Sequence, residues 1–255
     1  MFERELAFAN EAADRASEIA MSFFLGDFEV RQKPDLSPVT EADLAVENMF
    51  RASVAERFPG DAVIGEEQGR GAAAEREWII DPIDGTKNFS DGVPLWATLL
   101  ALHLNGRGVL GVISSPAMGE RYEAVRGGGA RWNGRDVRVS KHAALADAFF
   151  VFSSVDDWIE GPRHEAFLGL LRDTRRNRGF GDFWGHMLVA RGAADVMVEP
   201  ELAIWDWAAL KVIVEEAGGR VTTFEGEEPS DGSSILTTNG LVHDEVVARL
   251  AGGGE

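Results

Sequence analysis

Two aspartates stand three positions apart at the end of an apolar stretch, where they could bind a cation. The stretch 78–80 is Trp-Ile-Ile, which predicts a strand buried on both faces. Pro82 has no N–H to donate and Gly85 tolerates unusual backbone angles, so these two residues should end the strand. Ligands favour the crevice outside a strand end. Asp81 and Asp84 are therefore candidates for a functional site.

These two carboxylates need a positive partner, because neighbouring buried carboxylates raise one another's pKa. Lys87 is the only positively charged residue in the stretch 78–89, and it does not balance the further acidic segments. Because the ligands would be oxygens and the sequence has no cysteine, the pattern favours Mg²⁺ or Mn²⁺. An ordinary turn built from Asp, Pro and Gly is the alternative for this stretch taken alone.

A second acidic cluster follows the short apolar strand predicted at 62–64. Glu66 and Glu67 lie between glycines at the end of that strand. If this strand and the strand at 78–80 are neighbours in a sheet, Glu66 and Asp81 can share an ion. The alternative is a solvated acidic loop.

Two further aspartates stand at predicted helix starts. Thr40 is a suitable N-cap, which places Asp43 at the third helical position, where the helix dipole favours an acid. Asp206 lies at or next to the N-cap of the helix predicted to open within 202–207. Helix capping alone would explain both residues.

The segment 175–182 combines cations with an acid and is predicted to be a flexible loop. Its Arg178 and Asp182 could grip a charged substrate, although a solvated basic loop is at least as common. Glu199 ends a strand predicted at 196–199. The five histidines show no metal-ligand spacing, and the sequence has no G-x-S-x-G motif.

The elements that must position these residues fall into two predicted lobes, 1–139 and 140–255. The first contains an amphipathic helix at 3–24, an extended hairpin or mobile flap at 28–40, a helix from Thr40, and a largely antiparallel sheet that includes a hairpin at Asn105-Gly106. The second contains strands at 148–152, 196–199, 220–223 and 234–238, and helices at 165–173, around 187–190, after 202 and at 242–250. The chain is thus predicted to have an α+β fold.

Composition excludes several classes of function. A net charge of −18 over 255 residues argues against nucleic-acid binding through phosphate contacts and against an anionic membrane surface. The absence of cysteine fits a reducing compartment. The charged, helical N-terminal segment predicts a folded helix instead of a signal peptide, which indicates a cytoplasmic protein.

The acidic segments together resemble the signature segments of the inositol monophosphatase family of metal-dependent phosphomonoesterases. The matching segments are Gly65–Glu67, Asp81–Phe89 and Trp205–Ala209, and Thr40 with Asp43 fits the same family. The resemblance implies an αβαβα layered sandwich of the inositol monophosphatase and fructose-1,6-bisphosphatase type. It covers nearly the whole chain.

The resemblance also implies roles for individual residues. Glu66, Asp81 and the carbonyl of Ile83 would hold one Mg²⁺, and Asp81, Asp84 and Asp206 a second. Glu66 would also help to bind a third ion, as in relatives, with Glu67 in support, so the site would hold two or three Mg²⁺ ions, and Mn²⁺ could replace Mg²⁺. A dyad of Thr86 and Asp43 would orient and deprotonate the attacking water, so Asp43, Thr86 and Glu67 are the predicted catalytic residues. The predicted substrate contacts are Asp84, Gly85, Thr86, Lys87, Arg178, Asp182, Glu199 and Asp206.

Several segments are more similar to the histidinol-phosphate phosphatase branch than to the inositol branch. Among them are 93–102, 178–184 and 199–201. The predicted substrate is therefore the small phosphorylated amine L-histidinol phosphate, with a homodimer expected from the resemblance. The alternatives are an inositol-1-monophosphatase or broad sugar-phosphate phosphatase and, from another class, a non-catalytic acidic metal-binding regulatory protein. A nucleotide-3′-phosphate phosphatase is disfavoured because no adenine-stacking motif is evident.

Overall fold

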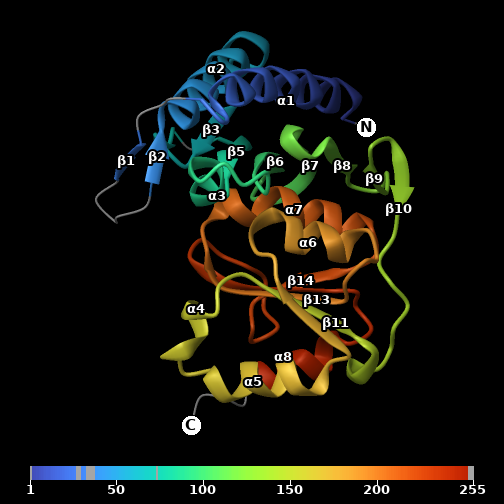
Figure 1. Ribbon diagram of the computed structural model, residues 1–255. Helices are drawn as coiled ribbons and strands as arrows, with labels where there is room; N and C mark the ends of the chain where they lie inside the picture. The colour runs from blue at the N-terminus through green and yellow to red at the C-terminus, as the bar shows by residue number, and fades with distance from the viewer. Residues whose placement is uncertain (1, 27–29, 33–37, 73, 252–255) are drawn as a thin grey trace.

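The computed structural model describes residues 2–26, 30–32, 38–72 and 74–251. Figure 1 shows five layers, in which pairs of helices alternate with two sheets. The helix pairs are α1 (Glu3–Phe23) with α2 (Glu41–Arg57), α6 (Asp182–Ala190) with α7 (Ile204–Glu216), and α5 (His164–Asp173) with α8 (His243–Ala251). This order confirms the predicted αβαβα sandwich.

Helices α1 and α2 cover the outer face of the larger sheet. Helix α1 buries Ala9, Ala13, Ala16 and Ala20 on one face, and it packs on the sheet and on α2. Small side chains at this spacing let a helix approach its neighbours closely. The hydroxyl of Thr40 accepts from backbone N–H groups of the first turn of α2, as its N-cap assignment predicts.

The larger sheet has eight strands in the order β10-β9-β8-β7-β6-β5-β3-β4. The strands are β3 (Ala62–Gly65), β4 (Gly69–Arg70), β5 (Arg76–Asp84), β6 (Ala97–Leu104), β7 (Arg107–Ser115), β8 (Glu120–Val125), β9 (Ala130–Trp132) and β10 (Arg135–Val137). Every pair is antiparallel except β3 with β5, which run parallel. This parallel pairing confirms the neighbouring strands that a shared site of Glu66 and Asp81 requires.

Strand β5 does not end at Pro82, contrary to the sequence prediction. It continues to Asp84, and its register with β6 shifts between Asp81 and Asp84. Proline is tolerated at such an irregularity because no ladder hydrogen bond is needed from it. The carbonyl of Pro82 accepts from the hydroxyl of Thr98 at 2.8 Å. Both aspartates therefore lie on the strand, one on each side of the register shift.

The smaller sheet has five strands in the order β12-β11-β13-β15-β14. They are β11 (Phe149–Phe152), β12 (Arg176–Gly179), β13 (Val196–Leu202), β14 (Arg220–Thr222) and β15 (Ser233–Thr238). Strand β12 corrects the predicted flexible loop at 175–182, because 176–179 pairs in parallel with β11. The charged side chains that suggested a loop are also those that edge strands tolerate.

The remaining short elements connect these layers. They are β1 (Val30–Gln32), β2 (Pro38–Thr40), α3 (Thr86–Ser90), α4 (Asp156–Ile159) and 3₁₀ turns at Pro116–Met118 and Leu145–Asp147. Antiparallel pairing of β1 with β2 confirms a hairpin in the predicted segment 28–40, whereas residues 27–29 and 33–37, and with them the proposed flap, lie outside the described residues. Within the described part of the chain, no helix combines the length and hydropathy needed to cross a membrane.

Candidate functional site

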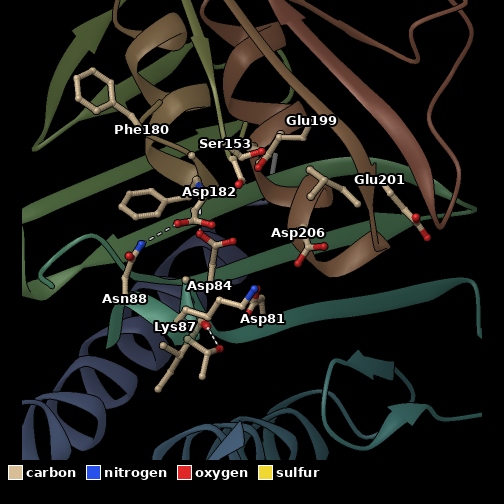
Figure 2. A pocket seen from close by; sticks show the side chains of 18 of the residues that line it. Asp81, Asp84, Lys87, Asn88, Ser153, Phe180, Asp182, Glu199, Glu201 and Asp206 are labelled. Atoms are coloured by element: carbon tan, nitrogen blue, oxygen red, sulfur yellow. Dashed lines mark hydrogen bonds between the residues drawn. The ribbon is translucent and has the colours of Figure 1, made fainter. Parts of the chain in front are cut away.

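A cavity of about 930 Å³ lies between the two sheets, where β5, α3, α6, β13 and α7 meet (Figure 2). Most of the residues predicted from the sequence line it, although they come from both halves of the chain. Those that line it are Glu66, Asp81, Ile83, Asp84, Gly85, Thr86, Lys87, Asp182, Glu199 and Asp206.

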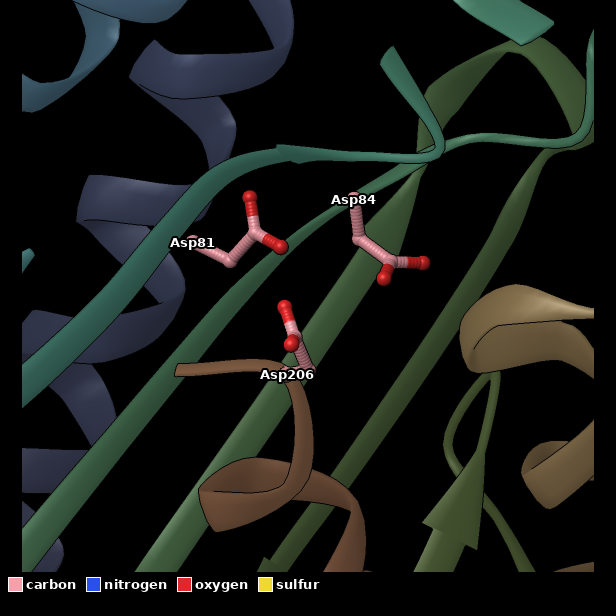
Figure 3. A group of neighbouring side chains, drawn as sticks. All are labelled: Asp81, Asp84 and Asp206. Carbon is pink, nitrogen blue, oxygen red and sulfur yellow. The ribbon is translucent and has the colours of Figure 1, made fainter. Parts of the chain in front are cut away.

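Three of the aspartates that line this cavity converge on one another (Figure 3). Asp81, Asp84 and Asp206 each offer a carboxylate oxygen, and these oxygens all lie within 4.8 Å of one another. Asp206 is the third residue of α7, and its Oδ2 accepts from the N–H of the N-cap residue Ala203 at 2.8 Å. The prediction that Asp206 lies at or next to the N-cap is therefore wrong by a few positions. The carboxylate thus caps the helix and faces the cavity.

Burial raises the pKa of every acid in this group. Removal from water is the largest cause for Asp81 and Asp84, whose pKa values lie well above the usual range. The negative charges of Glu66 at Asp81, and of Asp182 at Asp84, add to the effect. Burial and neighbouring acids also raise the pKa of Asp206 to about 7. The carboxylates therefore repel one another and favour a cation between them.

The donor set fits a hard divalent cation. Oδ1 of Asp81 is buried and has no hydrogen-bond partner among the described residues. A buried carboxylate oxygen without a donor is costly, and a bound ion would satisfy it. Oxygen-only ligands favour Mg²⁺ or Mn²⁺ over softer metals. Asp81, Asp84 and Asp206 would hold the ion.

The turn after β5 is shaped by Gly85. This residue has a φ of 82°, and a Cβ atom there would lie 2.8 Å from the carbonyl oxygen of Leu95. Any other residue would be strained and would collide with the backbone. Next to it, the Thr86 hydroxyl donates to the carbonyl of Ile83 at 2.9 Å. Because a carbonyl oxygen has two lone pairs, the predicted metal contact of Ile83 remains available.

Asp43 is fully buried at the third position of α2. Its Oδ2 accepts from the backbone N–H of Thr40 at 2.7 Å and from the Thr40 hydroxyl at 2.5 Å, so the capping role is confirmed. The charge of Asp43 also helps to raise the pKa of Asp81, which places it near the cluster. Asp43 and Glu67 are not among the cavity-lining residues, and the dyad of Asp43 with Thr86 stays a prediction.

Hydrogen bonds tie the start of α6 to the end of β5 and to α3. The N–H of Phe183 donates to Oδ2 of Asp84 at 2.8 Å, and Oδ2 of Asp182 accepts from Asn88 at 2.9 Å (Figure 2). Burial and the charge of Glu199 raise the pKa of Asp182 to about 7. The second half of the chain is thereby fixed against the first at the cavity.

A buried histidine lies within hydrogen-bonding distance of Glu199. His186 has no exposed surface, and its Nε2 lies 2.8 Å from Oε2 of Glu199 while its Nδ1 lies 2.7 Å from the hydroxyl of Thr237. No spacing rule identified this histidine, because it stands within an apolar helical run. Only the packing of α6 against β13 and β15 reveals its contact with the cavity wall.

Arg178 is the predicted substrate contact that the structure places elsewhere. It lies exposed on the edge strand β12, donates to the carbonyl of Asn177 at 2.7 Å and does not line the cavity. The cavity instead includes polar residues that sequence reasoning missed: Asn88, Ser153, Ser154, Asp157 and Glu201. Ser153 and Asp157 follow the end of β11, so the strand-end rule applied to 149–152 would have suggested them.

The raised pKa values predict how metal binding changes stability with pH. The carboxyls of Asp206 and Asp182 have a pKa of about 7 in the folded protein, against 3.8 in the unfolded chain. Their protonated forms stabilise the folded state. This stabilisation is complete below pH 3.8 and is lost as the pH rises through 7. A divalent ion offsets that loss by binding the ionised cluster. We therefore expect Mg²⁺ to raise Tm by roughly 5 °C more at pH 7.5 than at pH 5.

Thermal unfolding with Mg²⁺ and with EDTA at both pH values measures this difference. His103 and His243 have pKa values lowered by burial to about 4, so their contribution has the opposite sign and is lost below pH 6.5. Neither histidine lines the cavity. Subtracting the EDTA curve therefore removes their effect. An equal Mg²⁺ effect at both pH values would contradict the assignment of the cluster.

Comparison with known proteins places this geometry in a family. A model of the inositol monophosphatase family matches residues 2–252. A histidinol-phosphatase of Mycobacterium tuberculosis is 45% identical, with 99% of this chain and 100% of the relative covered, and one of Streptomyces coelicolor is 42% identical, with 96% of each covered. The solved structure of a Thermotoga maritima IMPase superposes with a TM-score of 0.89 at 33% identity, covering 98% of both chains. The chain belongs to the inositol monophosphatase family.

Proposed function

We propose that this protein is a Mg²⁺-dependent phosphatase that hydrolyses L-histidinol phosphate to L-histidinol and phosphate. The observation that carries the proposal is an acidic wall beside the aspartate cluster, formed by the cavity-lining residues Asp182, Glu199, Asp157 and Glu201. Figure 2 labels three of them, Asp182, Glu199 and Glu201. Lys87 is the only cation among the described residues that line the cavity. A substrate with an amine and an imidazole supplies the positive charge that these acids lack.

The names of the relatives support the same substrate. Both the Mycobacterium and the Streptomyces relatives are histidinol-phosphatases, and they align with nearly the whole of this chain. At the other end of the substrate, the phosphate would lie at the aspartate cluster beside Gly85 and Thr86, whose N–H groups we expect to donate to its oxygens. The ester would then span the cavity from cluster to acidic wall.

The residues of the chain would divide the chemistry as follows. Bound divalent ions polarise a phosphoryl group and lower the pKa of water. Thr86 would accept from the attacking water and donate to Asp43, which takes up the proton. In the present structure the Thr86 hydroxyl donates to Ile83, so this role requires it to turn when substrate binds. Asp182 and Glu199 would orient the amine end of the ester.

Phosphate release from a panel of phosphomonoesters tests the proposal. We expect L-histidinol phosphate to be hydrolysed with the highest kcat/KM in Mg²⁺, and EDTA to abolish turnover. Much faster hydrolysis of inositol 1-phosphate would instead favour the alternative, a broad inositol- and sugar-phosphate phosphatase. That alternative is supported by a Thermotoga maritima fructose-1,6-bisphosphatase/inositol-1-monophosphatase, 39% identical with 82% of this chain and 80% of the relative covered. No turnover of any ester would favour a metal-binding regulatory protein.

Replacing Glu199 by Gln should lower activity selectively. A charge-assisted hydrogen bond contributes about 1.5 to 3 kcal/mol, so kcat/KM for L-histidinol phosphate should fall roughly 10- to 100-fold, mainly through KM. Hydrolysis of glycerol 2-phosphate, which has no amine, should change less than about threefold. Steady-state kinetics with both esters measure the ratio. An equal loss for the two esters would show that Glu199 supports the site without recognising the amine.

The proposal includes the metal ion, the oligomeric state and the cellular compartment. We expect Mg²⁺ to be the working ion with Mn²⁺ able to replace it, a homodimer, and action in the cytoplasm. The assembly is tested by light scattering during gel filtration. The ion is tested by restoring the EDTA-treated protein with single metals.

A further inference from the structure

A fully buried glutamate in α2 contacts the loop that carries Glu66. Glu47 has no exposed surface, although the rest of the buried face of α2 is formed chiefly by apolar residues. Its Oε2 accepts from the backbone N–H of Glu67 at 2.8 Å, and its Oε1 accepts from the N–H of Gln68 at 3.1 Å. One carboxylate therefore binds two consecutive amides of the loop between β3 and β4.

Arg51 extends this contact to both sides of the loop. Its Nε donates to Oε1 of Glu47 at 2.7 Å. Its Nη1 donates to the carbonyl of Val63 at 3.2 Å and its Nη2 to the carbonyl of Gly69 at 2.6 Å. The pair thus satisfies backbone groups on β3, in the turn and on β4. We refer to Glu47 and Arg51 as the α2 clamp.

Gly65 shows how closely the clamp approaches the strand end. A Cβ atom at this position would lie 2.4 Å from Cδ and Oε1 of Glu47. The carboxylate occupies the space that a side chain would need, so a larger residue immediately before Glu66 would displace the carboxylate of Glu47. The glycine and the glutamate of α2 therefore fit together as one arrangement.

Burial of this charge is better explained by the site than by stability. A buried ion pair is expensive to desolvate, and an apolar residue of similar size often stabilises a helix interface equally well. An apolar residue would, however, leave the amides of Glu67 and Gln68 without these acceptors. Helix α2 also carries Asp43 one turn before Glu47, on the same face. The helix therefore connects two acidic segments of the site.

We propose that Glu47, together with Arg51, is a positioning residue that holds the 66–68 turn so that Glu66 faces the aspartate cluster. The proposal rests on the proposed function, in which Glu66 is a metal ligand. Glu66 lines the cavity, and its charge raises the pKa of both Asp81 and Asp206, so its position relative to them governs how the site binds a cation. Replacing a residue that orients a metal ligand without binding the metal itself typically lowers metal affinity 10- to 100-fold.

Glu47→Gln tests the clamp, because glutamine keeps the size of the side chain but turns one acceptor oxygen into a donor. We expect the Mg²⁺ concentration for half-maximal activity to rise at least about tenfold, with KM for the phosphate ester within about twofold at saturating Mg²⁺. Direct Mn²⁺ binding, followed by electron paramagnetic resonance, should weaken by the same factor. The matched control is Arg70→Gln, which breaks the 2.8 Å pair of Arg70 on β4 with Glu77 on β5 but leaves the turn amides bonded. It should leave both metal constants within about twofold.

Hydrogen exchange supplies a second measurement, and its first part uses the wild-type protein alone. The amides of Glu67 and Gln68 should be protected in the wild type. They should lose this protection in the folded Glu47→Gln protein. Unprotected wild-type amides, or unchanged Mn²⁺ affinity in the folded variant, would overturn the clamp. Failure of the proposed function looks different: the wild type would hydrolyse no phosphate ester in Mg²⁺, while Mn²⁺ binding and exchange would still report on Glu47.

Discussion

Replacing Asp84 by Asn is expected to lower kcat/KM at least about 1000-fold while the fold is retained. Asp84 belongs to the three-carboxylate cluster, and a bound divalent ion supplies several kcal/mol of transition-state stabilisation, with each 1.36 kcal/mol corresponding to a factor of ten. Asparagine keeps one oxygen for the N–H of Phe183 that now donates to Asp84. It also removes a buried acid whose ionisation is unfavourable. Metal-free Asp84→Asn should therefore unfold at the same temperature as the wild type, or higher, above pH 7.

Asp91→Asn is the matched control for this variant. Asp91 is exposed at the end of α3, seven residues further along the chain, and it does not line the cavity. The same chemical change there should alter kcat/KM by less than about twofold. Both variants are compared by steady-state kinetics over a range of Mg²⁺ and by calorimetry in EDTA. Asp84→Asn with activity within tenfold of the wild type would remove Asp84 from the metal site.

Replacing Asp195 by Ala is expected to cause a large loss of stability at a position outside the cavity. Asp195 is 1% exposed, and its carboxylate accepts from the N–H of Phe149 at 2.6 Å, from the hydroxyl of Ser140 and from the amide of Asn239, with Nδ1 of His142 at 3.0 Å. These partners join the segment between the two sheets to β11 and to the end of β15. Alanine leaves the N–H of Phe149 and the hydroxyl of Ser140 without this acceptor, at about 1 to 3 kcal/mol each.

The free energy of unfolding should therefore fall by about 3 kcal/mol or more, which lowers Tm by roughly 6 to 12 °C for a chain of this size. Chemical denaturation and calorimetry measure both quantities. Below the transition, kcat should stay within about twofold, because Asp195 does not line the cavity. The control is Asp136→Ala. The side chain of Asp136 is 88% exposed and pairs with Arg131 on the surface, so its removal should change the free energy of unfolding by less than about 0.5 kcal/mol. Equal effects of the two changes would show that the buried network contributes little.

Local chemistry made much of the site predictable from the sequence. The apolar run before Asp81, the capping pattern of Thr40 with Asp43, and the Gly85 turn depend on residues a few positions apart, so their conformations follow from short-range sterics and hydrogen bonding. The same local rules misplaced details. Pro82 was expected to stop β5, but an irregular register accommodates it, and charged residues at 176–179 form an edge strand because tertiary pairing outweighs their weak β-propensity.

The contacts between distant segments were decided by the tertiary structure. The family resemblance implied that Asp206 meets Asp81. The physical cause of that approach is how α7 packs between the two sheets, and no periodicity in the sequence specifies it. The support of Glu199 by His186 depends in the same way on packing, and so does the place of Arg178 away from the cavity. By itself, then, the sequence determined which acids are available and which of them end strands or begin helices. Which acids share one pocket was decided by the folded chain, because desolvation and charge repulsion act through space between segments that only the packed layers bring together.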